Sequence, residues 1–206
     1  MLDLTSYEDD YVLIRDGIAY PKLPTPPFYE TVINTRWPLF ADARLQAYRS
    51  VRSKIELAVL SKTGLYISGG LGVGKTHLLV AAYRYVAEQG YHPILTSVMA
   101  MIDDIKAEIE TKETYMVPHF QEAEWLFLDD MGSGLLTRYI ADRLLAILTY
   151  RHDVQLPTFV TSNFGLNALA NGLNKDGNVD GDRIASRLRG MCAVLELKGP
   201  DRRQKP

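Results

Sequence analysis

The sequence predicts an α/β fold, with a parallel sheet covered by helices on both faces, and two observations support this prediction. From residue 40 onward, short apolar runs alternate with longer segments of helical periodicity, which is typical of such folds. A glycine-rich segment over residues 69–74 also connects a predicted strand with a predicted helix, the context in which phosphate-binding loops occur. The chain has 206 residues, so we expect one domain with appendages.

Residues 1–40 are predicted to form an N-terminal strap, and residues 41–206 a single globular domain. Two apolar runs within residues 11–20 flank Gly17, a pattern that predicts a short hairpin. Four prolines within residues 21–27 then predict an irregular linker.

Composition excludes several classes of protein. The single cysteine, Cys192, excludes a disulfide framework and a cysteine-based zinc site. The N-terminus is acidic, which argues against a signal peptide, and no apolar run approaches the roughly 18 residues of a membrane span. We therefore expect a cytoplasmic protein. The net charge of −2 argues against a uniformly basic coat, although residues 183–206 carry seven basic and two acidic residues, a local charge of +5.

Periodicity places the remaining elements along the chain. Ser97 is the expected N-cap of one helix, because a serine precedes its apolar face. Helices are predicted over residues 44–60, 75–89, 98–109, 135–152 and 183–189, and strands over residues 65–68, 93–96, 125–128, 157–161 and 193–197.

The glycine-rich segment fits the pattern G-x-x-x-x-G-K-[ST] at every fixed position. Glycines let successive backbone N–H groups point inward at phosphate oxygens, and the N-terminus of the following helix adds partial positive charge. The lysine is expected to reach the β and γ phosphates, and the threonine hydroxyl to bind Mg²⁺. The residues of the pattern are Gly69, Gly70, Leu71, Gly72, Val73, Gly74, Lys75 and Thr76.

Two acidic residues, Asp129 and Asp130, follow the apolar strand at residues 125–128. Ligands of open α/β sheets bind at the carboxyl ends of the strands, so we expect Asp129 to hold the Mg²⁺ and Asp130 to orient or deprotonate the attacking water. Asn163 follows the next strand. From the residues alone, a contact with water or phosphate and the capping of a following helix are equally good interpretations of this asparagine.

With these motifs in order, the chain resembles the AAA+ ATPases, specifically the DnaC-type helicase loaders and the IstB-type transposition helper ATPases. The resemblance covers about residues 45–206 and includes residues 72–78, 128–132, 161–163, 183–188 and 197–203. It implies that residues 69–77, which end at His77, bind ATP.

The resemblance also implies roles for single residues. Asn163 matches the sensor 1 residue that reads the γ-phosphate. Arg183 matches the arginine finger that acts on the ATP of a neighbouring subunit, and Arg187 matches the second arginine of that motif. Arg203 matches sensor 2, with Arg202 as the alternative.

The implied function is an ATP- and Mg²⁺-dependent ATPase that assembles with copies of itself on DNA, with single-stranded DNA as the expected form, and loads or recruits a replicative helicase. The alternatives are a transposition helper that serves a transposase, a nucleotide-gated scaffold with little hydrolysis, and a small-molecule kinase. The insert at about residues 97–120 could contact DNA through Lys106, Lys112 and Tyr115. The alternative interpretation is that these lysines are only solvated and that the side chains of the insert serve adaptable packing.

Only about 40 residues precede the core, fewer than the partner-binding region of the loaders. This difference puts the helicase partner in doubt more than the ATPase.

Overall fold

A five-stranded parallel sheet forms the centre of the fold in the computed structural model, which describes residues 12–15, 18–21, 28–111, 115–132, 138–174 and 180–203. The chain enters the sheet at its fourth position, crosses to the far edge, returns strand by strand to the third position and then passes the first strand to reach the other edge. All pairs are parallel, so the carboxyl ends of all five strands meet at one edge. In spatial order the strands are β4 (Ile94–Ser97), β5 (Leu126–Met131), β6 (Thr158–Ser162), β3 (Gly64–Gly69) and β7 (Cys192–Leu197).

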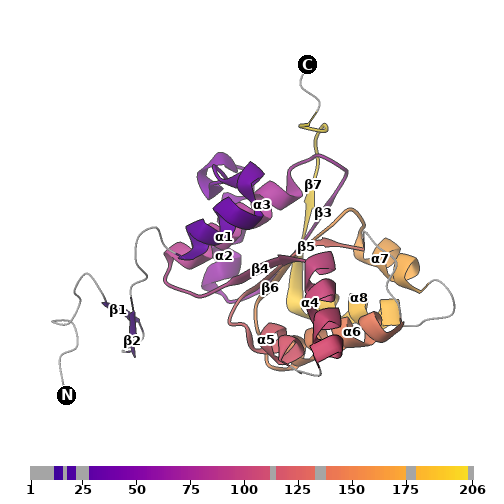
Figure 1. The fold of residues 1–206 in the computed structure, drawn as a ribbon. Coiled ribbons are helices and arrows are strands. Elements are labelled where there is room, and N and C mark those ends of the chain that lie inside the picture. Colours follow the sequence, from indigo (N-terminus) through magenta and orange to yellow (C-terminus); the bar gives the residue numbers. More distant parts are fainter. Residues whose placement is uncertain are drawn as a thin grey trace.

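Helices cover both faces of this sheet (Figure 1). Alternate residues of β5 point to opposite faces: Phe127 joins the apolar cluster that contains helices α1–α3, and Leu128 joins the cluster that contains helices α4–α8. The predicted α/β class is therefore confirmed. The helices are α1 (Phe28–Arg36), α2 (Arg52–Leu60), α3 (Lys75–Glu88), α4 (Val98–Thr111), α5 (Met116–Glu122), α6 (Arg138–Asp153), α7 (Leu166–Leu173) and α8 (Asp180–Met191), with short 3-10 turns η2 (Pro38–Phe40) and η3 (Leu45–Ala47).

The helix predicted over residues 44–60 is wrong in its first half. Arg44 is extended, η3 makes a single 3-10 turn, and regular α-helix begins only at Arg52. The apolar spacing misled the prediction because Leu45 and Tyr48 are both buried, but Tyr48 turns into a cavity beside α3. Tertiary contacts decide the backbone here, and periodicity does not.

Helix α1 was not predicted, since the prolines before it suggested only a strap. Its Ile33 is fully buried in the same cluster as α3, and Glu30 forms an ion pair with Arg84 of α3. This part of the N-terminal region therefore packs on the sheet domain.

Most other elements lie within a few residues of their predicted positions. Ser97 caps α4 as predicted, since its Oγ accepts a hydrogen bond from the amide of Ala100 at 3.1 Å. The expected hairpin is present as β1 (Val12–Arg15) paired antiparallel with β2 (Ile18–Pro21), while the predicted turn at Gly17 lies outside the described residues. The predicted start of α6 at residue 135 is also outside them. Over the described ranges, none of the helices is both long and apolar enough to cross a bilayer.

Candidate nucleotide-binding site

The glycine-rich loop runs from the end of β3 to the start of α3, as its sequence context predicts. Gly72 and Gly74 adopt φ angles of 69° and 101°, values that residues with a β-carbon rarely adopt. A β-carbon at Gly72 would also overlap the carboxylate of Asp201 in the C-terminal tail, which would have to turn away. The positive φ is therefore the feature that requires glycine at position 72.

Lys75 begins α3 and folds back over the loop. Its side chain is buried, and Nζ donates hydrogen bonds to the carbonyl oxygens of Gly69 at 3.0 Å and Gly70 at 2.7 Å. Burial lowers the pKa of Lys75, while the carboxylates of Asp130 and Asp129 act in the opposite direction. The ammonium group is thus held within the loop, next to two acidic side chains.

Asp129 lies at the centre of a hydrogen-bonded group. Thr76 Oγ1 donates to its carboxylate at 3.1 Å, and Thr161 Oγ1 donates to Oδ1 at 2.6 Å. Only 6% of Asp129 is exposed, and burial raises its pKa, although the hydrogen bonds from Thr161 and Thr76 partly oppose this. A hydroxyl and a carboxylate in contact are the hard oxygen ligands that fit Mg²⁺.

Asp130 occupies an irregular position in β5. The pairing of β5 with β6 shifts between Leu128 and Met131, and Asp130 has a positive φ of 60°. Its amide donates to Thr161 Oγ1 at 2.9 Å. The hydroxyl of Thr161 therefore orders the backbone of Asp130 as well as the carboxylate of Asp129.

Asn163 contacts Asp130 and does not cap a helix. Its Nδ2 lies 3.4 Å from Oδ1 of Asp130, whereas α7 has Gly165 at its N-cap position, with no side-chain capping bond. Of the two interpretations left open by the sequence, the geometry excludes capping by Asn163.

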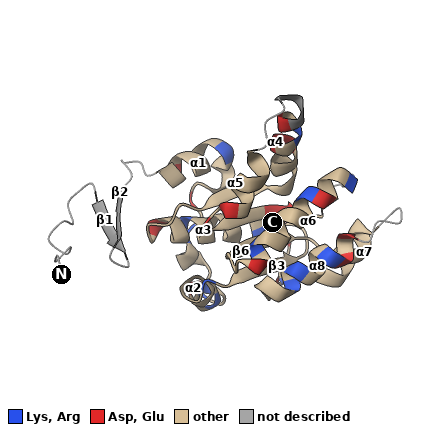
Figure 2. Ribbon diagram, turned by 90° about the horizontal axis from the view of Figure 1, so that it is seen from below, with Lys and Arg blue, Asp and Glu red and all other residues tan. Residues whose placement is uncertain are grey.

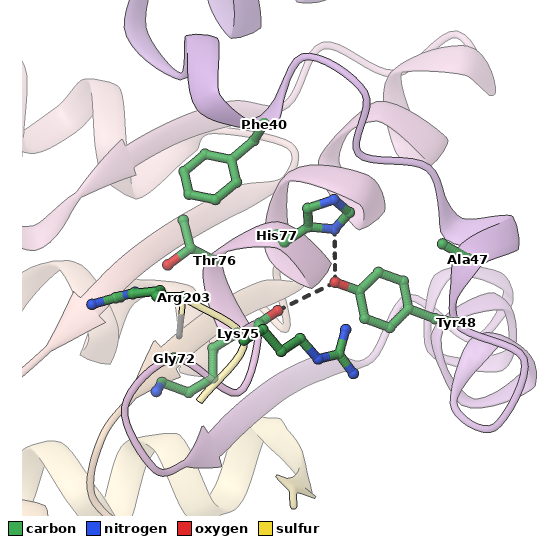
Figure 3. Close-up of a pocket in the computed structure, with 10 residues that line it drawn as sticks. Phe40, Ala47, Tyr48, Gly72, Lys75, Thr76, His77 and Arg203 are labelled. Carbon is green, nitrogen blue, oxygen red and sulfur yellow. Dashed lines mark hydrogen bonds between the residues drawn. The ribbon is translucent and has the colours of Figure 1, made fainter. Parts of the chain in front are cut away.

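A cavity of about 390 Å³ lies beside the loop. Besides Gly72, Gly74 and residues 75–77, it is lined by Phe40, Ala47, Tyr48, Arg202 and Arg203. In the view of Figure 3, Tyr48 faces His77 on one side, while Thr76, Lys75 and Arg203 lie on the other side of His77. The cavity therefore has a polar end at the loop and an aromatic end beyond it.

Hydrogen bonds fix the aromatic end. Tyr48 Oη lies 2.7 Å from His77 Nδ1 and donates to the carbonyl oxygen of Gly74 at 3.3 Å (Figure 3). The ring of Phe40 meets that of His77 edge-on, with centroids 6.2 Å apart. Burial raises the pKa of Tyr48 to about 12 and lowers the pKa of His77.

A buried arginine anchors the segment that carries Phe40 and Tyr48. Arg84 of α3 is 1% exposed; Nε donates to the carbonyl oxygen of Ala43 at 3.1 Å, and a terminal nitrogen donates to that of Ala41 at 2.7 Å. Since α3 also begins with the loop lysine, one helix positions both ends of the cavity.

The C-terminal tail closes the cavity from the side of the loop. The amide of Arg202 donates to the carbonyl oxygen of Gly72 at 3.0 Å, and the amide of Arg203 donates to Asp201 Oδ1 at 2.9 Å. Both arginines expected at the sensor 2 position line the cavity.

Arg183 lies apart from these residues. It is in the first turn of α8, which packs against α6 and α7 on the face of the sheet opposite α3 (Figure 1). Its side chain is 65% exposed, 3.4 Å from Asp180, and it does not line the cavity. Figure 2 shows further basic residues along α8 and along the neighbouring α6.

The structure thus brings together the predicted residues of the loop, Asp129, Asp130 and Asn163 at one edge of the sheet, and leaves Arg183 outside. Sequence reasoning missed the cavity roles of Phe40, Ala47 and Tyr48, and gave Thr161 no role of its own. No motif marks the first three. Thr161 stands at the end of a predicted strand, two residues before Asn163. This position could have indicated that it contacts the end of the neighbouring strand.

Comparison with known proteins agrees with this site. The sequence model of the family described as IstB-like ATP binding protein matches residues 41–206. The replicative helicase loader DnaI of Bacillus subtilis (strain 168) is 29% identical over 147 residues, which is 68% of this chain and 47% of DnaI. The chain therefore spans about half the length of this relative.

Solved structures show the same fold. The crystal structure of DnaI superimposes with a TM-score of 0.65 at 30% identity, covering 78% of this chain and 90% of that one. The crystal structure of the DnaC helicase loader gives a TM-score of 0.68 at 24% identity, covering 78% and 99%. The AAA+ type of P-loop fold is thereby confirmed.

Proposed function

This chain belongs to the family of IstB-like ATP-binding proteins, and from that premise we propose that it hydrolyses ATP at a site shared between neighbouring subunits assembled on DNA. The observation that carries this proposal is the contact of Asp129 with Thr76 of the loop helix and with Thr161 of the adjacent strand. These contacts bring a phosphate-binding loop, a metal ligand and the Asp130–Asn163 pair to one strand edge.

At the polar end, the loop amides and Lys75 bind the phosphates. Lys75 exchanges its bonds to the carbonyl oxygens of Gly69 and Gly70 for phosphate oxygens, which better match its charge. Thr76 and Asp129 hold Mg²⁺, which, when bound, neutralises charge that develops on the phosphates.

Asp130 and Asn163 act on the attacking water. Asp130 is the general base, because it adjoins the metal ligand and keeps a carboxylate oxygen in contact with Asn163. The amide of Asn163 is a donor, so it holds that carboxylate in place and is available to the γ-phosphate.

Arg183 supplies the arginine finger to a neighbouring subunit. Its exposure and its place outside the cavity of its own chain support action in trans. Such a finger stabilises transition-state charge and contributes about 10³- to 10⁵-fold to the rate. Arg203, or Arg202 in its place, contacts the bound nucleotide from the tail.

DNA and a replicative helicase are the proposed partners, as the similarity to the replicative helicase loader DnaI suggests. Tyr115, at the start of α5, supports single-stranded DNA as the form bound, because the residue is 64% exposed and its ring stacks on His119 with centroids 5.4 Å apart. Exposed aromatic rings stack on unpaired bases. Lys106 of α4 is also exposed, while Lys112 lies outside the described residues. A role beside a transposase is the alternative.

Steady-state ATP hydrolysis measured against protein concentration, with and without single-stranded DNA, tests the proposal. We expect the rate per subunit to rise with concentration, to rise further with DNA and to collapse in Arg183→Ala. The matched control is Arg189→Ala, an exposed arginine on the same helix that contacts Asn167. A rate that is independent of concentration, DNA and Arg183 would contradict the shared site, and bound ATP without turnover would indicate a scaffold.

A further inference from the structure

The aromatic end of the cavity contains one ring nitrogen whose hydrogen-bonding state is set by its neighbours. Tyr48 Oη contacts both His77 Nδ1, at 2.7 Å, and the carbonyl oxygen of Gly74, at 3.3 Å. A carbonyl oxygen can only accept, and a tyrosine hydroxyl has a single hydrogen. Both contacts are satisfied together only if Tyr48 donates to Gly74 and accepts from a protonated Nδ1 of His77.

This chain of bonds leaves Nε2 of His77 as an acceptor. A neutral imidazole carries one proton, so a protonated Nδ1 implies an unprotonated Nε2. In the part of the chain that the structure describes, the contact of the His77 ring with Tyr48 is made by Nδ1 and not by Nε2.

The position of His77 suits contact with the base of a nucleotide. His77 follows Thr76 directly in the first turn of α3, so it lies next to the phosphate-binding residues and lines the same cavity. Phe40 and Tyr48 contribute aromatic surface on either side of it. A purine whose phosphates occupy the loop is therefore expected to place its rings among these side chains.

We propose that His77 makes the site selective for adenine, with Nε2 accepting a hydrogen bond from the 6-amino group of the base. Guanine carries an oxygen at this position, which is itself an acceptor and repels the lone pair of Nε2. The inference rests on the proposed function, since it requires ATP to occupy this cavity. It adds a base-reading residue to a site whose motifs concern only the phosphates.

Binding measurements with three nucleotides test this inference. Calorimetric titrations of wild type compare ATP, GTP and purine riboside 5′-triphosphate, which has the adenine ring system without its amino group. We expect wild type to bind ATP about tenfold more tightly than the deamino analogue, a typical loss for one hydrogen bond to a buried acceptor, and to bind GTP more weakly still. Equal affinities for ATP and the analogue in wild type would overturn the inference without any variant.

Variants identify the residue responsible. His77→Phe keeps an aromatic ring but has no acceptor, and it should bind ATP and the deamino analogue equally. Tyr48→Phe removes the hydroxyl that fixes the tautomer, and it should lower the ratio of the two affinities while retaining the ring. Should His77→Phe keep the ratio of wild type, another group reads the base and the inference is wrong.

Lys75→Ala separates this inference from the proposed function. If wild type binds ATP and Lys75→Ala does not, the nucleotide occupies the loop, and only the ratios decide whether His77 reads the base. If wild type binds no ATP, or Lys75→Ala binds it as well as wild type, both the proposed function and the inference fail.

Discussion

The polar and aromatic ends of the nucleotide cavity are built in different ways. The polar end consists of loop residues, and Thr76 connects it to Asp129 at the end of β5. Backbone geometry and charge restrict these positions to a few residue types. The aromatic end consists of ring surfaces from the segment before α2 and of His77, while the tail lies at the loop side with Arg202 and Arg203. Phosphate chemistry demands particular residues at fixed spacing, whereas a base can be enclosed by many side chains, so only the polar end is visible as a motif.

The largest expected effect belongs to hydrolysis at the polar end. Asp130→Asn should lower kcat by about 10²- to 10⁴-fold, because it removes the proposed general base, while the affinity for ATP changes little. Single-turnover hydrolysis and calorimetric binding measure the two quantities separately. The matched control is Asp103→Asn, an exposed carboxylate on α4. An equal loss of affinity and rate would show that Asp130 binds nucleotide rather than activating water.

Binding at the polar end should depend most on Lys75. Lys75→Ala should weaken the binding of ATP about 100-fold, because it removes the buried cation that meets the phosphates. Calorimetry with ATP measures the effect, and Lys54→Ala, an exposed lysine on α2, serves as the control. Retention of affinity within a few-fold would contradict the assignment of the phosphate site.

The aromatic end should give a smaller effect of a different kind. Phe40→Ala should weaken ATP binding about tenfold, since it removes ring surface from the base, but it should leave the binding of inorganic tripolyphosphate unchanged. Its neighbour Leu39→Ala is the control, because that side chain is 86% exposed. A parallel loss for tripolyphosphate would mean that the two ends of the cavity are not separable.

The smallest effect concerns stability without nucleotide. Burial raises the pKa of Asp129, so the charged carboxylate destabilises the folded protein at neutral pH. This destabilisation is absent below the pKa that the carboxyl group has in the unfolded chain. It grows as the pH rises toward the pKa of the group in the folded protein and is complete above that pKa. Asp129→Asn retains an Oδ1 acceptor for Thr76 and Thr161, and it should raise Tm at pH 7 by about 2–4 °C, the shift produced by 1 kcal/mol in a chain of this size.

Thermal melts of Asp129→Asn and wild type from pH 4 to pH 8 measure this difference. The gain should shrink toward acid pH, where the wild-type carboxyl becomes neutral. A gain that is independent of pH would show that the carboxylate charge is not its cause.

The sequence predicted the sheet, its helices and the polar end of the cavity because these depend on local rules. Strands that are buried on both faces give short continuous apolar runs, and the loop requires glycine where φ is positive. The aromatic end escaped prediction for a physical reason. Tyr48 has helical spacing with Leu45 and Val51 in the sequence, but Arg84 binds carbonyl groups of the preceding segment and holds it out of helical geometry.

The roles of individual tail and strand residues were also beyond the sequence. Arg202 and Arg203 are adjacent, and only their backbone contacts with Gly72 and Asp201 show that both reach the cavity. Thr161 contacts Asp129 and Asp130 across neighbouring strands, a relationship that depends on the register of β5 and β6 and on its shift near residue 130.

Mixing two inactive variants would test the shared site most directly. Asp130→Asn retains Arg183 but lacks the proposed base, and Arg183→Ala has the reverse defect, so each alone should hydrolyse little ATP. An equal mixture should recover activity at roughly a quarter of its interfaces, where an intact Asp130 site meets an intact Arg183 across a head-to-tail contact. A mixture that stays as inactive as its components, while both variants fold, bind ATP and assemble, would contradict a site completed by the neighbouring subunit.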